Sequence, residues 1–174
     1  RPVQGLPAHP LVRAALAALL LSACAHAPSG LTRDELVLSL PTRSVTTELR
    51  AATLQRKGLL VNYLTSWCFP CLTDLAVLTR LQKDHEADGL VVVIVGLDLE
   101  GARVLAPFAQ ESGLTMPVLV ADDRIRNGES PLGRLRELPV KVLFDRDGRL
   151  VTGYSGVADP AALVALVKAT LDKR

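Results

Sequence analysis

The uninterrupted apolar run at residues 90–95 places the strongest constraint on what this chain can fold into. Val and Ile follow Leu90 without interruption, and these β-branched residues favour strands. A strand with no polar face has to be covered on both sides, which is typical of parallel sheets that lie between layers of helices. We therefore expect an α/β fold with this strand in the middle of its sheet.

Other apolar runs of strand length alternate with segments of helical period. We predict strands at residues 36–40, 58–64, 118–120, 140–145 and 150–154, helices at 70–86, 102–111 and from Pro160 onward, and a loop at 122–131. The expected buried stripes of the first and last of these helices are Leu72, Leu75, Leu78 and Leu81, and Leu163, Leu166, Val167 and Leu171. Asp147-Gly148 between the last two strands predicts a hairpin. This order of strands and helices along the chain predicts a three-layer fold, in which the central mixed sheet has parallel strands first and an antiparallel hairpin last.

Length and composition narrow the class of protein. A chain of 174 residues matches one globular domain. Twenty Lys and Arg against eighteen Asp and Glu, with one Trp, two Tyr and three Phe, provide neither a basic stripe nor a stacking platform for nucleic acid. Three cysteines are too few for a disulfide-stapled scaffold, so their positions matter more than their number.

The N-terminal segment has the features of an export signal. Arg1 and Arg13 flank a stretch without acidic residues, and an apolar run follows at 14–21. This run is shorter than the roughly 20 residues that a helix needs to cross a bilayer. Leu21-Ser22-Ala23-Cys24 resembles the lipobox of bacterial lipoproteins, in which the cysteine takes up the lipid and becomes the new N-terminus.

We therefore expect a signal peptide at residues 1–23, a lipidated Cys24 with its tether at 24–34, and a folded domain at 35–174. Two alternatives are a plain secretory peptide cleaved near Ala25 or Ala27, and an apolar helix of the mature fold. Lipidation and plain secretion both export the domain to an oxidising compartment.

The motif Trp67-Cys68-Phe69-Pro70-Cys71 carries the chemistry, because it lies between a predicted strand and the helix that follows. At a helix N-terminus, free N–H groups and the helix dipole favour the thiolate of Cys68 and lower its pKa from about 8.5. Cys71 lies one turn further, close enough to form a disulfide with Cys68 and expel a bound substrate. Pro70 suits the first helical turn, and Trp67 can shield the disulfide or contact a partner.

A pair of cysteines at this spacing is also half of a structural zinc site, and an inert buried pair is a further alternative. Zinc would need two more ligands at similar spacing, and the chain does not offer them. Cys24, His9 and His26 lie in the export segment and tether, while His85 lies in a charged helix end and is expected to be solvated.

Two more stretches complete a family resemblance. Val61-Asn62-Tyr63-Leu64 leads into the cysteine motif, and Leu138-Pro139-Val140 precedes Phe144-Asp145-Arg146-Asp147-Gly148. Over about residues 36–171 the chain resembles the thioredoxin superfamily, and within it the exported TlpA/ResA-like thiol-disulfide oxidoreductases. The resemblance implies a thioredoxin-like fold, with the helix-strand insertion of TlpA-like members at about residues 100–138.

The resemblance also implies a substrate-binding surface. In that family the proline matching Pro139 has a cis peptide bond and faces the cysteine pair, and the residue before it, Leu138 here, offers main-chain hydrogen bonds to a substrate. With the rim of the cysteine motif, the implied substrate-binding residues are Trp67, Phe69, Pro70, Leu138 and Pro139.

A candidate acid/base group follows from the same comparison. Thioredoxin has a buried aspartate at the position of Asn62, and an amide cannot carry a proton in that way. Many TlpA/ResA-like proteins have a glutamate three residues after the second cysteine, where this chain has Asp74. We expect Asp74 to serve Cys71 as acid/base, with a bridging water if its shorter side chain requires one. Alternatively, Asp74 stabilises the first helical turn through the dipole.

The expected function is that of a membrane-tethered reductase that faces the periplasm and needs no cofactor. By resemblance, its partners are disulfide-bearing exported proteins and a membrane thiol donor of the DsbD/CcdA type, with apocytochrome c or metal-site thiols as typical family substrates. A soluble periplasmic or secreted location is the alternative.

Two other functions use the same fold. Soft thiolates favour Cu(I), which suggests a copper-binding module, although Met116 is the sole methionine and lies far along the chain. A thiol peroxidase is suggested by the Thr-x-x-Cys spacing of Thr65 and Cys68, which is a weak signal by itself.

Overall fold

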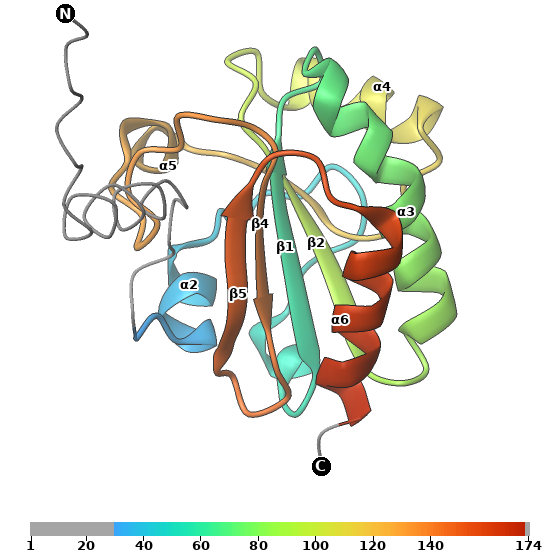
Figure 1. Cartoon of the computed structure of the whole chain (residues 1–174). Coiled ribbons are helices and arrows are strands. Elements are labelled where there is room, and N and C mark those ends of the chain that lie inside the picture. The colour runs from blue at the N-terminus through green and yellow to red at the C-terminus, as the bar shows by residue number, and fades with distance from the viewer. Residues whose placement is uncertain (1–29, 173–174) are drawn as a thin grey trace, which may run out of the picture.

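The computed structural model describes residues 30–172, and a five-stranded sheet forms its centre (Figure 1). The strands, in spatial order, are β3 (Val118–Val120), β2 (Leu90–Gly96), β1 (Gly58–Leu64), β4 (Val140–Phe144) and β5 (Leu150–Ser155). β1, β2 and β3 are parallel, whereas β4 pairs antiparallel with both β1 and β5. The predicted mixed sheet, with its final hairpin, is confirmed. The predicted signal peptide and Cys24 lie outside the described residues.

Residues 90–95 form the predicted buried parallel strand, but their predicted place in the middle of the sheet was wrong, because β1 is the middle strand. β2 contains that run and lies between β3 and β1. Every residue of β1 is buried, and β2 is buried except for the half-buried Val91. Asn62 interrupts the apolar pattern of β1, and this made β1 look less central than it is.

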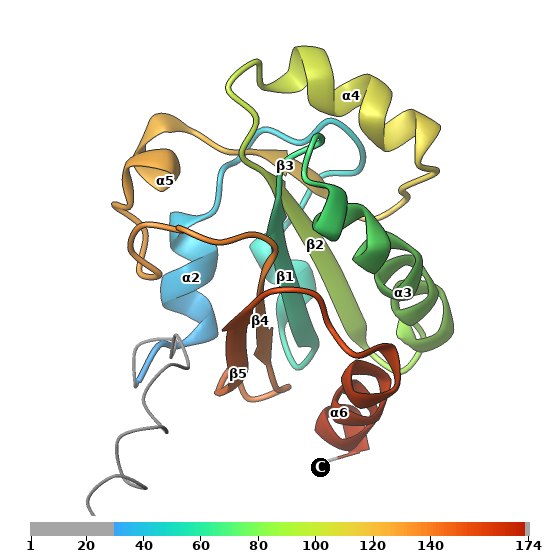
Figure 2. The same cartoon turned by 45° about the horizontal axis from the view of Figure 1, so that its top comes forward.

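Helices cover both faces of the sheet (Figure 2). They are α2 (Arg33–Ser39), the 3-10 helix η1 (Ala51–Leu54), α3 (Phe69–His85), α4 (Ala102–Glu111), α5 (Asp123–Asn127) and α6 (Pro160–Asp172). α3, α4 and α6 contribute to the core on one face, and α2, η1 and α5 to the core on the other. The predicted three layers are therefore present. Within the described residues, none of the helices combines the length and apolar character needed to cross a membrane.

Successive side chains of β1 alternate between the two cores, which lie on opposite faces of the sheet. Leu60 and Leu64 belong to the core beneath α3 and α6, whereas Leu59, Val61 and Tyr63 belong to the core beneath α2 and α5. Successive side chains of a strand point to opposite faces. Asn62 therefore points toward α3, the helix that begins with the cysteine motif.

Residues 36–40, predicted as a strand, lie mostly in helix α2. Thr32 caps this helix: its hydroxyl accepts the Glu35 N–H at 3.3 Å, and the Glu35 carboxylate accepts the Thr32 N–H at 2.9 Å. In a strand, Leu36, Leu38 and Leu40 would share one face, but Leu36 and Leu40 are buried and Leu38 is 85% exposed, which fits the spacing of a helix face. The capping box at Thr32 stabilises the start of a helix at these residues.

Residues 122–131, predicted as a loop, contain the short helix α5. The Asp122 carboxylate accepts the N–H of Ile125 at 3.1 Å, and Gly128 ends the helix with φ of 84°. A Cβ at Gly128 would lie 2.8 Å from the backbone nitrogen of Arg134, so only glycine fits there without a shift.

The buried stripe of α3 differs from the predicted one at its start. Leu75, Leu78 and Leu81 are buried as expected, but Leu72 is 38% exposed. Cys71 and Asp74 occupy the buried positions of the first turns instead. In α6, Leu163, Val167 and Leu171 are buried and Leu166 packs partly buried against them. The N-terminal end of α3 therefore places polar and sulfur atoms inside the core.

Candidate active site

Cys68 and Cys71 form a disulfide at the N-terminus of α3, at the spacing that the sequence predicts. Their Cα atoms are 5.2 Å apart and the S–S distance is 2.06 Å. Cys68 is the N-cap residue, and its sulfur accepts the N–H of Cys71 at 3.3 Å. Pro70 lies in the first turn, where its missing N–H costs no helical hydrogen bond. The helix N-terminus therefore directs a backbone N–H at the Cys68 sulfur.

The two sulfurs differ in accessibility. Cys68 is 7% exposed and Cys71 is fully buried, so a reacting partner reaches Cys68 first. Trp67 and Phe69 on either side of Cys68 are each 75% exposed, and Pro70 is exposed as well. The disulfide thus lies beneath a rim of apolar side chains that other proteins can contact.

Asp98, which the sequence analysis missed, holds the turn that leads into the disulfide. Its carboxylate accepts the Ser66 N–H at 3.0 and 3.1 Å and the Ser66 hydroxyl at 2.6 Å. Asp98 is 1% exposed and follows β2, while Ser66 follows β1. Carboxyl ends of adjacent parallel strands meet at one sheet edge, so a polar residue after β2 was the available signal.

Leu138 and Pro139 lie at the same edge of the sheet. Val140, the first residue of β4, pairs with Tyr63 near the end of β1, and the Leu138-Pro139 bond is cis, as the resemblance implied. Pro139 is buried, and its carbonyl accepts the N–H of Gly156 at 2.8 Å. Among residues 30–172, no hydrogen bond engages the main-chain groups of Leu138.

Asp74 lies inside the core behind the disulfide. It is 1% exposed, forms an ion pair with Lys141, and accepts the Ala158 N–H at 3.1 Å. Asp74 follows the first turn of α3, so the alternative of a first-turn carboxylate that interacts with the helix dipole is wrong. Cys71 lies three residues earlier on the same helix, where side chains are neighbours.

Lys141 of β4 was not singled out from the sequence, although a lysine inside an apolar strand is a signal. It is fully buried, and its ammonium group also donates to the Gly156 carbonyl at 3.0 Å. Burial lowers the pKa of Lys141, and the Asp74 carboxylate opposes this shift. Burial, together with the charge of Asp74, raises the pKa of Tyr154 to about 12.

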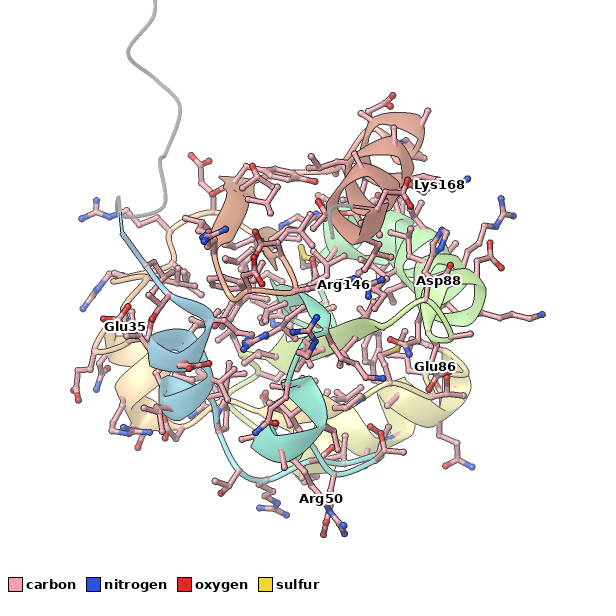
Figure 3. The ribbon with its side chains drawn as sticks, turned by 90° about the horizontal axis from the view of Figure 1, so that it is seen from below. Glu35, Arg50, Glu86, Asp88, Arg146 and Lys168 are labelled. Atoms are coloured by element: carbon pink, nitrogen blue, oxygen red, sulfur yellow. A yellow bond between two sulfur atoms is a disulfide. The ribbon has the colours of Figure 1, made fainter. Side chains whose placement is uncertain are left out.

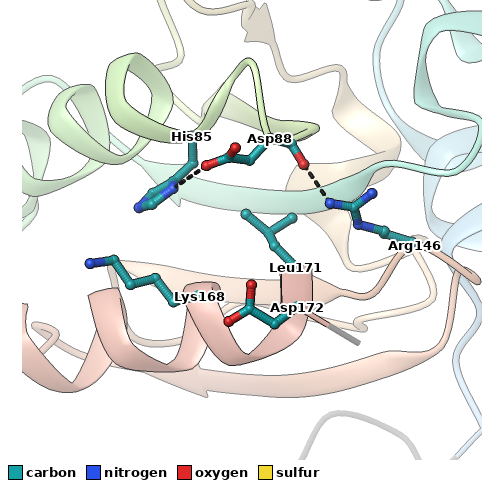
Figure 4. Close-up of a pocket in the computed structure, with 6 residues that line it drawn as sticks. All are labelled: His85, Asp88, Arg146, Lys168, Leu171 and Asp172. Atoms are coloured by element: carbon teal, nitrogen blue, oxygen red, sulfur yellow. Dashed lines mark hydrogen bonds and ion pairs between the residues drawn. The ribbon is translucent and has the colours of Figure 1, made fainter. Parts of the chain in front are cut away.

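A pocket of about 510 Å³ opens at the other end of α3 and is drawn in Figure 4, and Figure 3 labels Asp88, Arg146 and Lys168 of its lining as seen from below. It is lined by His85, Asp88, Arg146, Lys168, Leu171 and Asp172. Because α3 has 17 residues, this end lies about 25 Å from the disulfide. The pocket takes no part in the site.

His85 is less solvated than predicted. Its side chain is only 12% exposed, and its Nδ1 lies 3.0 Å from the Asp88 carboxylate (Figure 4). The turn after α3 brings Asp88 back onto the ring, and Arg146 donates to the Asp88 carbonyl at 2.6 Å. Within residues 30–172, no group of three His, Cys, Asp or Glu side chains is arranged to hold a metal ion.

Comparison with known proteins matches this architecture. The model of the AhpC/TSA family matches residues 37–168. The thiol-disulfide oxidoreductase ResA of Bacillus thuringiensis (strain Al Hakam) is 26% identical over 103 residues, which cover 59% of this chain and 57% of ResA. A thiol-disulfide isomerase from Corynebacterium glutamicum superimposes with a TM-score of 0.66 at 21% identity, covering 78% of this chain and 95% of the isomerase.

A thiol:disulfide interchange protein of the thioredoxin family from Chlorobium tepidum TLS superimposes with a TM-score of 0.60 at 25% identity, covering 76% of this chain and 95% of that protein. The predicted thioredoxin-like fold and the resemblance to TlpA/ResA-like proteins are therefore confirmed. The chain matches little more than half the length of ResA.

The hydrogen bonds of Asp98 yield a stability prediction. Asp98→Ala removes the acceptor for the Ser66 N–H and hydroxyl, and we expect the free energy of unfolding to fall by about 1–3 kcal/mol in urea titrations. Asp123→Ala is the matched control, because Asp123 is 92% exposed and pairs only at the surface. An equal loss in both variants would contradict this role of Asp98.

Proposed function

Because this chain belongs to the AhpC/TSA family and has a disulfide at the entrance of α3, we propose that it is a thiol-disulfide oxidoreductase acting on other proteins. The single observation that carries the proposal is the position of Cys68, which caps a helix and is the more accessible of the two sulfurs. A thiolate in that position is stabilised by the helix N-terminus and can attack a disulfide.

In the reduced protein, the Cys68 thiolate attacks one sulfur of a substrate disulfide and forms a mixed disulfide, and the first substrate thiol leaves. Cys71 then loses its proton and attacks the Cys68 sulfur, which restores the Cys68–Cys71 disulfide and releases the second substrate thiol. Two electrons pass to the substrate in each cycle. The complete burial of Cys71 supports its role as the resolving thiol.

Asp74 is the proposed base for the resolving step. Its carboxylate lies on the same helix face as Cys71, one turn further along α3, and both side chains are buried. A buried thiol cannot pass its proton directly to bulk water, so an adjacent carboxylate is suited to accept it.

Substrate chains are proposed to bind at the rim of the disulfide. Trp67, Phe69 and Pro70 are exposed apolar residues that can cover a bound peptide. Leu138, held next to the end of β1 by the start of β4 and by Pro139, offers main-chain groups that can pair with an extended segment.

The proposed direction is reduction, with electrons supplied by a membrane thiol donor of the DsbD/CcdA type and passed to exported proteins such as apocytochrome c or proteins with metal-site thiols. The proposed location is the periplasmic side of a membrane, with Cys24 as the lipid anchor. The sequence at residues 21–24 supports this anchor.

Trapping experiments test the roles of the two cysteines. We expect Cys71→Ser to accumulate mixed disulfides through Cys68 in cell envelopes, because the resolving thiol is missing. Cys68→Ser, the matched control, should accumulate few. Equal trapping by both variants, seen on non-reducing gels, would contradict the assigned roles.

A redox titration against thiol buffers tests the direction of electron flow. The proposal predicts a reduction potential nearer to that of thioredoxin, about −270 mV, than to that of the oxidant DsbA, about −120 mV. A value near the latter would exclude a reductase. Faster turnover of hydrogen peroxide than of protein disulfides would favour a peroxidase instead, and Cu(I) retained against glutathione without disulfide turnover would favour a copper module.

Fractionation of cells tests the anchor. Cys24→Ala should move the protein from the membrane fraction to the soluble fraction, because the acyl chains are lost. Cys71→Ser serves as a control cysteine substitution that leaves the anchor intact. A membrane fraction that does not change in Cys24→Ala would contradict lipidation.

A further inference from the structure

Lys141 lies in the middle of β4 with its side chain completely buried. Lysine is almost never fully buried unless it is paired, since its ammonium group has three donors to satisfy. Here those donors meet the Asp74 carboxylate and the Gly156 carbonyl, and the ring of Tyr154 lies 5.5 Å from the nitrogen. The side chain is thus fixed in one orientation by groups from two parts of the chain, α3 and the end of β5.

The register of the sheet directs Lys141 toward the cysteine motif. In the antiparallel pair of β1 and β4, Lys141 lies directly opposite Asn62. Leu143, two residues further along β4, belongs to the core beneath α3, as do Leu60 and Leu64 on either side of Asn62. Lys141 and Asn62 therefore share the sheet face that α3 covers with Cys71 and Asp74.

The ion pair controls the state in which Asp74 can act. A carboxyl group in the core without a cationic partner is neutralised by a proton instead of remaining charged. A protonated Asp74 could not accept the proton of Cys71. The neighbouring Asn62 does not supply a substitute, because its amide carries no charge and makes no hydrogen bond within the described residues.

We propose that Lys141 is a positioning residue for the resolving step, which keeps the Asp74 carboxylate ionised and fixed next to Cys71. This inference rests on the proposed function. Cys71 transfers its proton to Asp74, and the resulting thiolate attacks the Cys68 sulfur of the mixed disulfide. The substrate sulfur leaves with the electron pair of the broken bond, and Asp74 passes its proton to the departing thiolate. No outside oxidant or reductant is needed in this step.

The titratable groups that face the ion pair are few among the described residues. The ring of Tyr154 comes from β5, and Gly156 and Ala158 contribute only backbone groups. Cys71 precedes Asp74 by three residues on α3, where side chains are neighbours. Since the pKa of Tyr154 is about 12, this side chain stays neutral in the range in which thiol exchange is measured. A change near neutral pH in a Lys141 variant therefore reports on Asp74 or on the cysteines.

Single-turnover kinetics with Ellman's reagent separate the two chemical steps. Attack by Cys68 on the reagent releases one chromophore, and attack by Cys71 on the resulting mixed disulfide releases the second. In Lys141→Gln we expect the second phase to slow by about tenfold or more near pH 6 and to recover as the pH rises, because a neutral buried carboxyl group loses its proton only at higher pH. The first phase should not change.

Three further variants define the effect. Lys83→Gln, which removes an exposed lysine of α3, is the matched control and should behave like the unmodified protein. Asp74→Asn should slow the second phase at every pH, since the base is absent. In the double variant Asp74→Asn with Lys141→Gln, the second phase should be no slower than in Asp74→Asn. This variant removes both buried charges together, so it can be measured even if Lys141→Gln does not fold.

A measurement that does not depend on catalysis tests the ionisation of Asp74 independently. The carbon-13 shift of the Asp74 carboxyl group in the oxidised protein should report an ionised group at neutral pH, and a protonated one in Lys141→Gln. A protonated Asp74 in the unmodified protein, or an unchanged pH profile in Lys141→Gln, would overturn the role of Lys141. If Asp74→Asn leaves the second phase unchanged, the role of Lys141 falls with that of Asp74, while release of both chromophores still supports the cysteine chemistry.

Discussion

The contact between the Cys68 sulfur and the N–H of Cys71 is the interaction on which the site depends. It exists because β1 delivers the chain to the start of α3 at the edge where β2 ends and β4 begins. The other residues of the site lie around this junction. Asp98 holds the turn before it, and Leu138 lies beside it. A sulfur that caps a helix experiences both a donor and the positive end of the dipole, and both favour its ionised form.

The junction also explains why a polar cluster lies in an otherwise apolar core. The face of the sheet beneath α3 carries leucine and valine side chains at most positions, but Asn62, Asp74 and Lys141 meet there behind the disulfide. A buried ion pair gives little net stability, because desolvation offsets the attraction of the charges. The position of this pair on the face that also holds the buried Cys71 is the basis of the role in proton transfer proposed above.

Local pattern predicted much of the architecture. The strand at residues 58–64, the helix entry at Cys68 and the final hairpin follow from a mostly apolar run, a cysteine motif between strand and helix, and an Asp-Gly turn. The strand predicted at residues 36–40 was wrong because leucine at every second position suggested one strand face, whereas the capping box of Thr32 begins a helix that leaves Leu38 exposed. Tertiary contacts such as Asp98 with Ser66, and Lys141 with Asp74, join segments far apart in sequence, and a single sequence does not contain that pairing.

The most direct test of the account measures the acidity of Cys68 in the reduced protein. Iodoacetamide labelling of the Cys71→Ser variant across a pH series gives the fraction of Cys68 present as thiolate. The account predicts half-maximal labelling at a pH well below that of a free cysteine, about 8.5. Labelling that follows the curve of a free cysteine would contradict it, because the helix N-terminus would then give no activation.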